Sequence, residues 1–367
     1  MIFRCQTSEM SKICQDVQSA ACSRTTNPYT ECLLVRSTGS GTVEIAGYNL
    51  ITGVRAEIAA MIDEEGAFVI PAKKLCDILT RLNGEDVRIE VNENYLCSID
   101  CARKHFSVNG LKPDAFPQID VREASATVSV GQSVLRELIR GTEFCASSDE
   151  TRTVHRGIKF TVRPGELELA ALDGYRLAVR KDFIAYNGDE LSFILPARSA
   201  KSLLRLLKDD DGAAELNVSG SQTVVTVGEY SLISDLLQGT FMNYRKSMPV
   251  SCPTSVRAGT GRLLEAVSGA SVFIDSPDKG PVKCVFDGDL LVVSSSTADG
   301  GAEIETEVST VGPPIEICFN SRYISEALNH CDTDEVILQL SGPLSPMLIV
   351  PPEGDAFTYM VLPVKVN

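Results

Sequence analysis

The sequence predicts an α+β chain built from three repeated domains. Three segments each combine a short apolar strand, a Pro or Asn break and an amphipathic helix. They cover residues 68–79, 193–204 and 317–328. The breaks at Pro71, Pro196 and Asn320 are 125 and 124 residues apart, which is the length of a domain and too long for a solenoid repeat. With 367 residues, the chain is also longer than one ordinary core requires.

Other elements repeat at a similar spacing. An apolar strand and helix face over residues 128–139 match those over 256–267, and a weaker third copy starts at Phe3. A β-rich stretch follows every second helix, at residues 87–91, 214–218 and 336–340. We therefore expect each domain to be a doubled strand–helix–strand unit. Two aromatic linker segments precede the predicted boundaries, which give domains 1–124, 125–251 and 252–367.

The dipeptide Asp173-Gly174 lies between two apolar stretches and predicts a tight hairpin, because Gly accepts a positive φ without steric cost. Asn49 lies 124 residues earlier and Asp299 lies 126 residues later, each just after a predicted strand. Two interpretations of residues 172–177 remain open. The segment is either an ordinary hairpin turn or one wall of a pocket for a partner, displayed by residues 175–177.

Composition narrows the classes of function. The formal charge is −15, the twelve cysteines are scattered without a Cys-x-x-Cys pair, and only three histidines are present. We expect reduced core cysteines, and the scarcity of histidine weighs against metal sites and acid–base catalysis. The N-terminus does not resemble an export signal, and no apolar run approaches the ~18 residues of a membrane span. The predicted location is therefore cytoplasmic, without membrane contact.

Positive charge is concentrated on the predicted helices of this acidic chain. After Pro196, basic residues recur at helical spacing on the face opposite the leucines: Arg198, Lys201, Arg205 and Lys208. The helices after Pro71 and Gly131 carry Lys73, Lys74, Arg81, Arg136 and Arg140. For any one such helix alone, a solvated face is the favoured interpretation. Because six helices share the bias and no aromatics interleave, we expect a common surface that meets the phosphate backbone without reading sequence.

Two alternatives belong to other classes of protein. The first is an enzyme, for example a nuclease with a carboxylate metal site at the dense acidic run Asp209-Asp210-Asp211. That run follows a predicted helix and precedes Gly212, which is typical of a solvated loop. The second is a repeat-built binding module without nucleic acid, which the basic helix faces disfavour. No phosphate-binding loop or nucleophile motif is found, so neither catalysis nor a cofactor nor a metal is predicted.

Four segments resemble the bacterial β sliding clamp, the processivity subunit of DNA polymerase III: residues 172–179, 239–245, 319–323 and 359–365. The resemblance extends over essentially the whole chain. It implies the DNA-clamp fold, with helices lining a ring and sheets outside, and a head-to-tail homodimer around double-stranded DNA. It also implies a non-catalytic replication factor. The replicative polymerase, the clamp loader and repair factors would bind through short linear motifs in a hydrophobic pocket.

The resemblance also assigns roles to single residues. The partner pocket would consist of Leu172, Gly174, Tyr175, Arg176, Leu177, Met242, Lys246, Ser247, Asn320, Tyr323, Leu344, Met360, Val361, Leu362, Pro363 and Val364. DNA would be met by Arg24, Lys73 and Arg198, and the predicted set is completed by Lys74, Arg136, Arg140, Arg152, Lys201 and Arg205. The subunit interface would use Phe106, Val108, Val272 and Phe273. The chain departs from the family pattern at Asp149, His155, Met242, Lys246 and Asn367.

Overall fold

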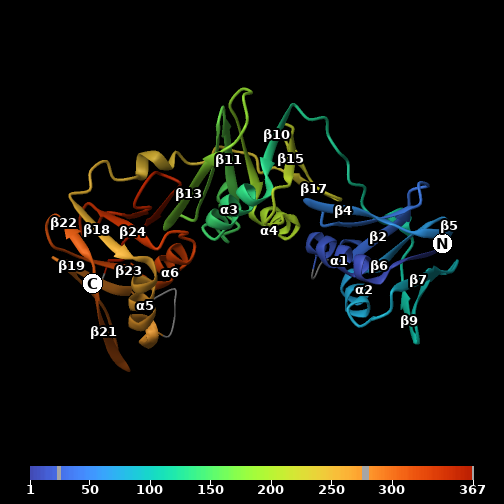
Figure 1. Cartoon of the computed structure of the whole chain (residues 1–367), viewed down its shortest axis with the longest axis horizontal. Helices are drawn as coiled ribbons and strands as arrows, with labels where there is room; N and C mark the ends of the chain where they lie inside the picture. Colours follow the sequence, from blue (N-terminus) through green and yellow to red (C-terminus); the bar gives the residue numbers. More distant parts are fainter. Residues whose placement is uncertain (23–25, 275–280, 366–367) are drawn as a thin grey trace. The chain divides into compact units, whose positions relative to one another are not determined.

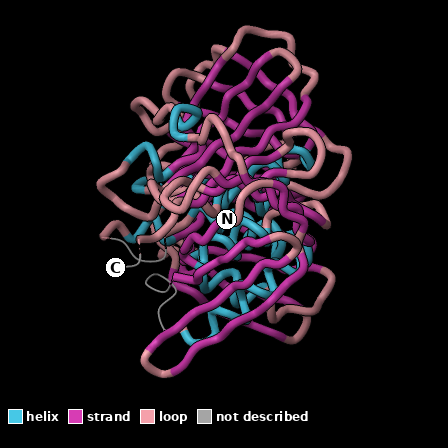
Figure 2. Tube along the Cα trace, turned by 90° about the vertical axis from the view of Figure 1, so that its left-hand side faces the viewer, coloured by secondary structure: helices cyan, strands magenta, loops and turns pink. Residues whose placement is uncertain are grey.

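The computed structural model describes residues 1–22, 26–274 and 281–365. The chain divides into two compact units (Figure 1). Unit 1 comprises Met1–Arg136 and Arg198–Leu236, and unit 2 comprises Glu137–Ala197 and Leu237–Asn367. The division falls within helix α3 (Gln132–Glu143) and at the start of helix α4 (Ala197–Leu206). Strands predominate, with the helices packed against them (Figure 2).

Unit 1 contains two antiparallel sheets, with strand orders β5-β1-β7-β8-β9 and β10-β15-β16-β17-β4-β3-β2-β6. Helix α1 packs on β3 and β4, so closely that a Cβ on Gly47 would lie 2.8 Å from the carbonyl oxygen of Val17. The elements are β1 (Ile2–Gln6), α1 (Thr7–Val17), β2 (Cys32–Ser37), β3 (Thr42–Tyr48), β4 (Thr52–Ala59), β5 (Met61–Glu64), β6 (Ala67–Pro71), α2 (Ala72–Leu79), β7 (Asp86–Val91), β8 (Leu96–Cys101), β9 (Lys104–Asn109), β10 (Ala126–Gly131), β15 (Ala213–Val218), β16 (Gln222–Val227) and β17 (Tyr230–Asp235).

Unit 2 also contains two sheets, with strand orders β14-β11-β12-β13-β26-β25-β24-β18-β22 and β21-β20-β19-β23. Helix α5 packs on β20, β21 and α6. The elements are β11 (Gly157–Arg163), β12 (Glu166–Leu172), β13 (Arg176–Phe183), β14 (Leu191–Pro196), β18 (Thr254–Gly259), α5 (Thr260–Ala270), β19 (Pro281–Asp287), β20 (Leu290–Thr297), β21 (Gly300–Glu307), β22 (Ser309–Val311), β23 (Ile315–Asn320), α6 (Ser321–Asn329), β24 (Glu335–Leu340), β25 (Met347–Val350) and β26 (Phe357–Val361).

The predicted doubled unit is confirmed, in the form strand–helix–three strands. It occurs six times along the chain, starting at β1, β6, β10, β14, β18 and β23, with β5 and β22 as additional strands. Neighbouring half-units exchange their first strands. For example, β1 pairs with β7 of the following half-unit, and β6 pairs with β2 of the preceding one. Pro71, Pro196 and Asn320 directly precede α2, α4 and α6, as the sequence predicted.

The predicted hairpin at Asp173-Gly174 is also confirmed, between β12 and β13. The Asp173 Oδ1 accepts hydrogen bonds from the backbone N–H groups of Tyr175 and Arg176, at 2.9 and 3.1 Å. Gly174 has a φ of +97°, which is the backbone conformation that only Gly adopts freely. Hydrogen bonds from the backbone to the Asp173 side chain stabilise this turn, so the turn depends on Asp173 as well as on Gly174.

The sister hairpins use the same device. In unit 1, the Asn49 Oδ1 accepts from the N–H groups of Ile51 and Thr52, at 3.1 and 2.9 Å. At the end of β20, the Thr297 Oγ1 accepts from the N–H of Asp299 at 3.3 Å. Thr297 lies 124 residues after Asp173, as Asp173 lies 124 after Asn49. The matching position in the third copy is therefore Thr297, and Asp299 is its hydrogen-bond donor.

The cysteines behave as the sequence predicted, because all twelve are free and most are buried. Asp209 forms an ion pair with Arg136 at 3.6 Å, and Asp210 accepts from the N–H of Gly212, so this acidic run is a loop after α4. Within the described ranges, no three His, Cys, Asp or Glu side chains are grouped to hold a metal ion. No helix in the same ranges is long and apolar enough to cross a bilayer.

Candidate functional site

The candidate site of unit 2 is built around the β12–β13 hairpin, and the last strand of the chain lies beside it. Strand β26 pairs with β13 so that Met360 faces Leu177 and Val361 faces Arg176. Beyond β26, the N–H of Leu362 donates to the carbonyl of Tyr175 at 2.9 Å. The hairpin and the C-terminal segment, which are far apart in sequence, thus form one continuous edge of the site.

The floor of the site is apolar and buried. Leu172, Leu177 and Met360 are each exposed by 5% or less and pack in one cluster with Val179, Ile194, Phe241, Tyr244 and Leu348. Leu362 packs against this cluster from its edge. The predicted pocket residues Leu172, Leu177, Met360 and Leu362, taken from distant parts of the sequence, are thus brought together.

Around this floor, large apolar side chains are exposed. Tyr175 is 58% exposed, Met242 41%, Leu344 67% and Val364 38%. Leu344 lies in the loop between β24 and β25, next along the chain to the strand that supplies Leu348 to the cluster. Exposed apolar groups beside an apolar floor are typical of a surface that binds a partner.

Arg176 fixes the hairpin to helix α6. Its side chain is buried and forms an ion pair with Asp173 at 2.9 Å and another with Glu326. It also donates to the carbonyl of Phe144 at 2.7 Å, and its guanidinium lies over the ring of Tyr323, 4.6 Å from the centroid. A buried guanidinium with this many partners holds its surroundings rigid. Arg176 is thus a structural support of the site.

Helix α6 supplies the opposite edge. Asn320 caps the helix by accepting from the N–H of Arg322 at 3.0 Å. The rings of Tyr323 and Tyr175 stack with centroids 6.3 Å apart. Burial alone would raise the pKa of Glu326, but hydrogen bonds from Arg322 and Arg176 outweigh it and lower that pKa below its ordinary value. The carboxylate of Glu326 on this edge therefore stays ionised to a lower pH than an ordinary glutamate does.

The chain segment after β17 covers one side of the cluster. Phe241 and Tyr244 are buried, and the Tyr244 hydroxyl donates to the buried Glu168 at 2.5 Å. Arg245 forms an ion pair with the same carboxylate. Burial and this bond raise the pKa of the Tyr244 hydroxyl. With these side chains turned inward, the predicted pocket residues Met242, Lys246 and Ser247 remain exposed.

Two further residues make contacts in the site that the sequence did not predict. Arg152, predicted to meet DNA, donates to the carbonyl of Asp173 at 3.0 Å. A Cβ on Gly174 would lie 2.3 Å from its guanidinium nitrogen Nη1. The ring of His155 meets Phe241 edge to face, with centroids 6.0 Å apart. Burial, with the nearby charge of Arg152, lowers the pKa of His155. The departure at His155 was visible in the sequence, but its ring contact was not.

The remaining pocket residues connect the C-terminal segment to β23. Pro363 forms a bridge with Phe319, and the N–H of Val364 donates to the carbonyl of Cys318 at 2.8 Å. The segment after β26 thus runs from the hairpin at Tyr175 to the edge of the other sheet of unit 2. It is held by backbone bonds at both ends, which leaves its side chains available for contact.

Most of the predicted DNA-contacting residues lie on helices α2, α3 and α4. In α4, Arg198, Lys201 and Arg205 are exposed, whereas Leu203 and Leu206 are buried. Lys73 and Lys74 are exposed on α2. Arg136 and Arg140 of α3 form ion pairs with Asp209 and Glu137, at 3.6 and 3.8 Å. Arg24 lies outside the described residues.

The predicted interface residues lie on or near strands at sheet edges. Phe106 is half-buried and Val108 is buried on β9, the edge strand of its sheet. Val272 is 74% exposed and Phe273 36%, and a Cβ on Gly300 of β21 would lie 2.9 Å from the Phe273 ring. Strand β21 is the edge of the other small sheet. Both strands therefore offer unpaired backbone groups.

Comparison with protein families gives three matches in chain order. Residues 1–120 match the N-terminal domain of the DNA polymerase III beta subunit, residues 129–243 its central domain, and residues 245–365 its C-terminal domain. The predicted boundaries at 124 and 251 remain predictions.

Similar proteins cover nearly the whole chain. A beta sliding clamp of Synechococcus elongatus is 30% identical over 374 residues, which span 99% of both chains. One of Staphylococcus aureus is 27% identical over 91% of this chain and 89% of the relative. Among solved structures, a Pseudomonas aeruginosa sliding clamp bound to griselimycin has a TM-score of 0.93 at 26% identity, with both chains fully covered. A Bacillus subtilis sliding clamp has a TM-score of 0.94 at 24% identity, which supports the fold.

Proposed function

The chain belongs to the bacterial beta sliding clamp family, the beta subunits of DNA polymerase III, and on that premise we propose that it acts as a ring-shaped, head-to-tail homodimer. The ring encircles double-stranded DNA and slides along it without reading sequence. The site of unit 2 tethers the replicative polymerase, the clamp loader and repair factors. In this role the chain is a non-catalytic accessory subunit of three domains, 1–124, 125–251 and 252–367.

The pattern of sheet joins carries this proposal. In four of the six half-units the last strand pairs with the last strand of another half-unit, through β17–β4 and β13–β26. The two remaining last strands, β9 and β21, are sheet edges. If β9 of one copy pairs with β21 of another copy in the same way, neither edge is left unpaired. Because β9 and β21 belong to different domains, this pairing joins the two copies head to tail.

The charges on these edges are complementary. If the β17–β4 register is applied to β9 and β21, His105 takes the place of Ser231 and Glu303 takes the place of Arg55, so the two residues face each other. The outward residues of β21, Glu303, Glu305 and Glu307, are all exposed and acidic. The basic residue Arg103 immediately precedes β9. An antiparallel pair would therefore place acidic residues against basic ones.

The basic helix faces suit a protein that binds DNA weakly and without sequence preference. Exposed Lys and Arg attract phosphates regardless of sequence, and that attraction is weakened by salt. A closed ring retains DNA by topology, so its lining needs only weak contacts that permit sliding. The overall charge of −15 discourages DNA from binding elsewhere on the surface.

The site of unit 2 suits short peptide motifs. Each apolar anchor that becomes buried contributes roughly 1.5–3 kcal/mol, and the loss of freedom on association offsets part of the sum. Two or three anchors then give dissociation constants on the order of micromolar. Such affinities allow different partners to exchange on one ring. The flexible Met242 at the rim adapts to motifs of different shape.

Solution mass and a charge exchange test the ring. The dimer predicts twice the 39.6 kDa chain mass at micromolar concentration. His105→Glu places like charges opposite Glu303 and should weaken the dimer on the order of fivefold. Adding Glu303→Lys to that variant should restore it. A monomer at all concentrations, or a double variant as weak as the single one, would argue against this interface.

Topology is tested by loading the protein onto nicked circular DNA with a clamp loader. The protein should remain on the circle in high salt and be lost once the DNA is linearised. Equal retention on both forms would exclude encirclement.

Partner binding is tested with a fluorescent peptide from the replicative polymerase. Met242→Ala should weaken binding severalfold, because Met242 stands exposed at the rim of the site. Val250→Ala is the matched control, since Val250 is fully exposed on the same segment of chain. Identical affinities for both variants would remove Met242 from the site.

A further inference from the structure

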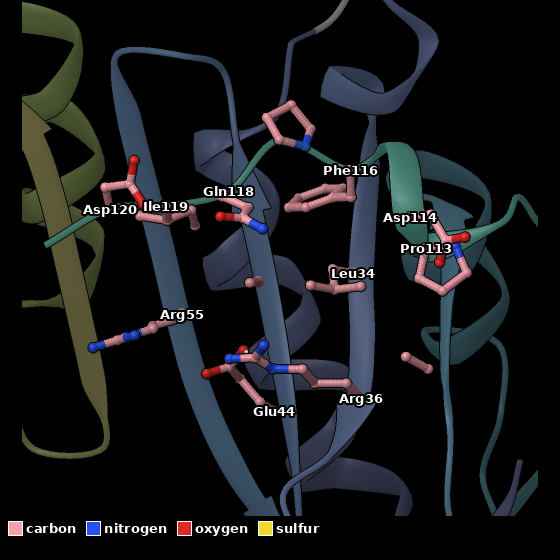
Figure 3. Close-up of a pocket in the computed structure, with 13 residues that line it drawn as sticks. Leu34, Arg36, Glu44, Arg55, Pro113, Asp114, Phe116, Gln118, Ile119 and Asp120 are labelled. Atoms are coloured by element: carbon pink, nitrogen blue, oxygen red, sulfur yellow. Dashed lines mark ion pairs between the residues drawn. The ribbon is translucent and has the colours of Figure 1, made fainter.

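Unit 1 contains a hollow that the proposed function does not use (Figure 3). It has a volume of about 510 Å³ and lies between strands β2, β3 and β4 and the segment 113–120. Figure 3 shows Phe116 at one end, the ion pair of Arg36 and Glu44 at the other, and Leu34 between them. The hollow therefore has an apolar end and a charged end, as a site for an amphipathic group does.

Strand pairing matches this hollow to the covered cluster of unit 2. Glu44 faces Arg36 across β2 and β3 as Glu168 faces Thr161 across β11 and β12. Phe116 packs on Val69 of β6 as Phe241 packs with Ile194 of β14. Phe116 and Phe241 are 125 residues apart, so the two chain segments cover matching faces of their sheets in the same way.

The hollow of unit 1 and the covered cluster of unit 2 differ by one aromatic ring. In unit 2, Tyr244 lies three residues after Phe241 and donates its hydroxyl to Glu168. In unit 1, the residue three after Phe116 is Ile119, which lies over Gly53, 3.0 Å from where a Cβ would be. Among the residues that the structure describes, no tyrosine hydroxyl is bonded to Glu44, and the space over the sheet stays open.

The charged groups of the hollow are available to a ligand. Glu44 is only 7% exposed, and its ion-pair partner at 2.8 Å is Arg36, whose side chain is 51% exposed and able to swing aside. The guanidinium of Arg55, also in the lining, has no hydrogen-bond or ion-pair partner within residues 1–22, 26–274 and 281–365. A half-buried, unpaired guanidinium favours a carboxylate partner.

We propose that this hollow is a second docking site, for a partner peptide that carries a tyrosine next to an acidic residue. The tyrosine ring packs on Leu34 and Ala46, its hydroxyl donates to Glu44, and the acidic side chain binds Arg55. The tyrosine thereby supplies from outside what Tyr244 supplies within unit 2. This site is separate from the proposed tether and does not depend on it.

The probe is the acetylated, amidated dipeptide Glu-Tyr, titrated into the full chain labelled at Ile and Leu methyl groups. NMR should show saturable shifts at Ile119 and Leu34 at millimolar peptide. The Glu-Phe dipeptide should bind about tenfold more weakly, because it lacks the hydroxyl bonded to a buried carboxylate. The Gln-Tyr dipeptide should lose a similar factor, and Arg55→Gln should abolish the preference for Glu-Tyr over Gln-Tyr.

Two substitutions make the result specific. Glu44→Gln should reduce binding severalfold, while Glu57→Gln, on β4 but outside the lining, should leave it unchanged. Ala67→Leu fills the hollow from its rim, beside Arg36 on the neighbouring strand, and should also block binding while Glu44 and Arg55 are kept. Shifts confined to the site of unit 2, or equal affinities for Glu44→Gln and Glu57→Gln, would overturn the proposal. The proposal would also be overturned if the Ile119 and Leu34 methyl signals shifted with protein concentration in the absence of peptide. The hollow would then be a contact between two copies of the chain.

Discussion

The two sheet faces that carry the Phe116 and Phe241 segments share one scaffold but are completed differently. In unit 2 the covering segment itself satisfies the buried Glu168, through Tyr244 and Arg245. In unit 1 the matching Glu44 is satisfied by Arg36 of the neighbouring strand, and the space above stays open. The difference shows that a repeated strand pattern fixes where a site lies, while a few side chains on the covering segment decide whether the site is filled.

The largest difference in stability between the two units is expected at the hairpins beside these faces. Arg176→Ala should lower the free energy of unfolding by about 3 kcal/mol, because it leaves Asp173 and Glu326 partly buried without their cation. At the matching position in unit 1, Thr52→Ala removes one hydrogen bond to Ser199 and should cost about 1 kcal/mol. Urea denaturation measures both. Equal losses would mean that Arg176 is no more of a support than its counterpart.

The buried carboxylates give the next largest difference. Glu168→Gln weakens bonds from both Tyr244 and Arg245 and should destabilise the protein by about 2 kcal/mol. Glu44→Gln weakens an ion pair with a half-exposed partner, so a loss below about 1 kcal/mol is expected. Thermal unfolding of the two variants compares them directly. A reversed order would contradict the view that the covering segment anchors Glu168.

The two turns should respond to substitution by different amounts. Gly174→Ala forces a side chain into a φ of +97° and against Arg152, so we expect a loss of about 1–2 kcal/mol. The residue at the matching position is Leu50, which already adopts a φ of +74°. Leu50→Gly relieves that strain and should change stability by less than about 1 kcal/mol. Urea midpoints at constant m-value test both. A harmless Gly174→Ala would show that the turn relaxes.

The smallest expected effect depends on pH. Burial lowers the pKa of His155 below its ordinary value, so the unfolded chain takes up a proton at a higher pH than the folded one. Stability should therefore decline as the pH falls below about 6.5, the ordinary pKa of histidine. It should level off once the folded form is also protonated. His155→Phe should remove this component of the pH profile, and an unchanged profile would assign it to other groups.

The repeat, the helices and the hairpins were predictable because they follow from local patterns of apolar residues, Pro and Asp-Gly. The partners of Arg176 were not, since Phe144 lies 32 positions away and Glu326 lies 150 away. Nor did any local pattern indicate that Arg152 would bond the hairpin at Asp173. The residues of the pocket came from a family resemblance, and the structure brings their floor together. The hollow of unit 1 was not predicted, because it arises from what Ile119 leaves unfilled.

The pairing of β13 with β26 has a consequence for synthesis. Strand β13 starts at Arg176 and its partner β26 starts at Phe357, so β13 is synthesised long before the strand that it pairs with. Until then, β13 is an open edge and the floor of the site lacks Met360. A polypeptide released early therefore has no finished surface for a partner to bind. Completion of this site therefore has to wait until β26 has been synthesised.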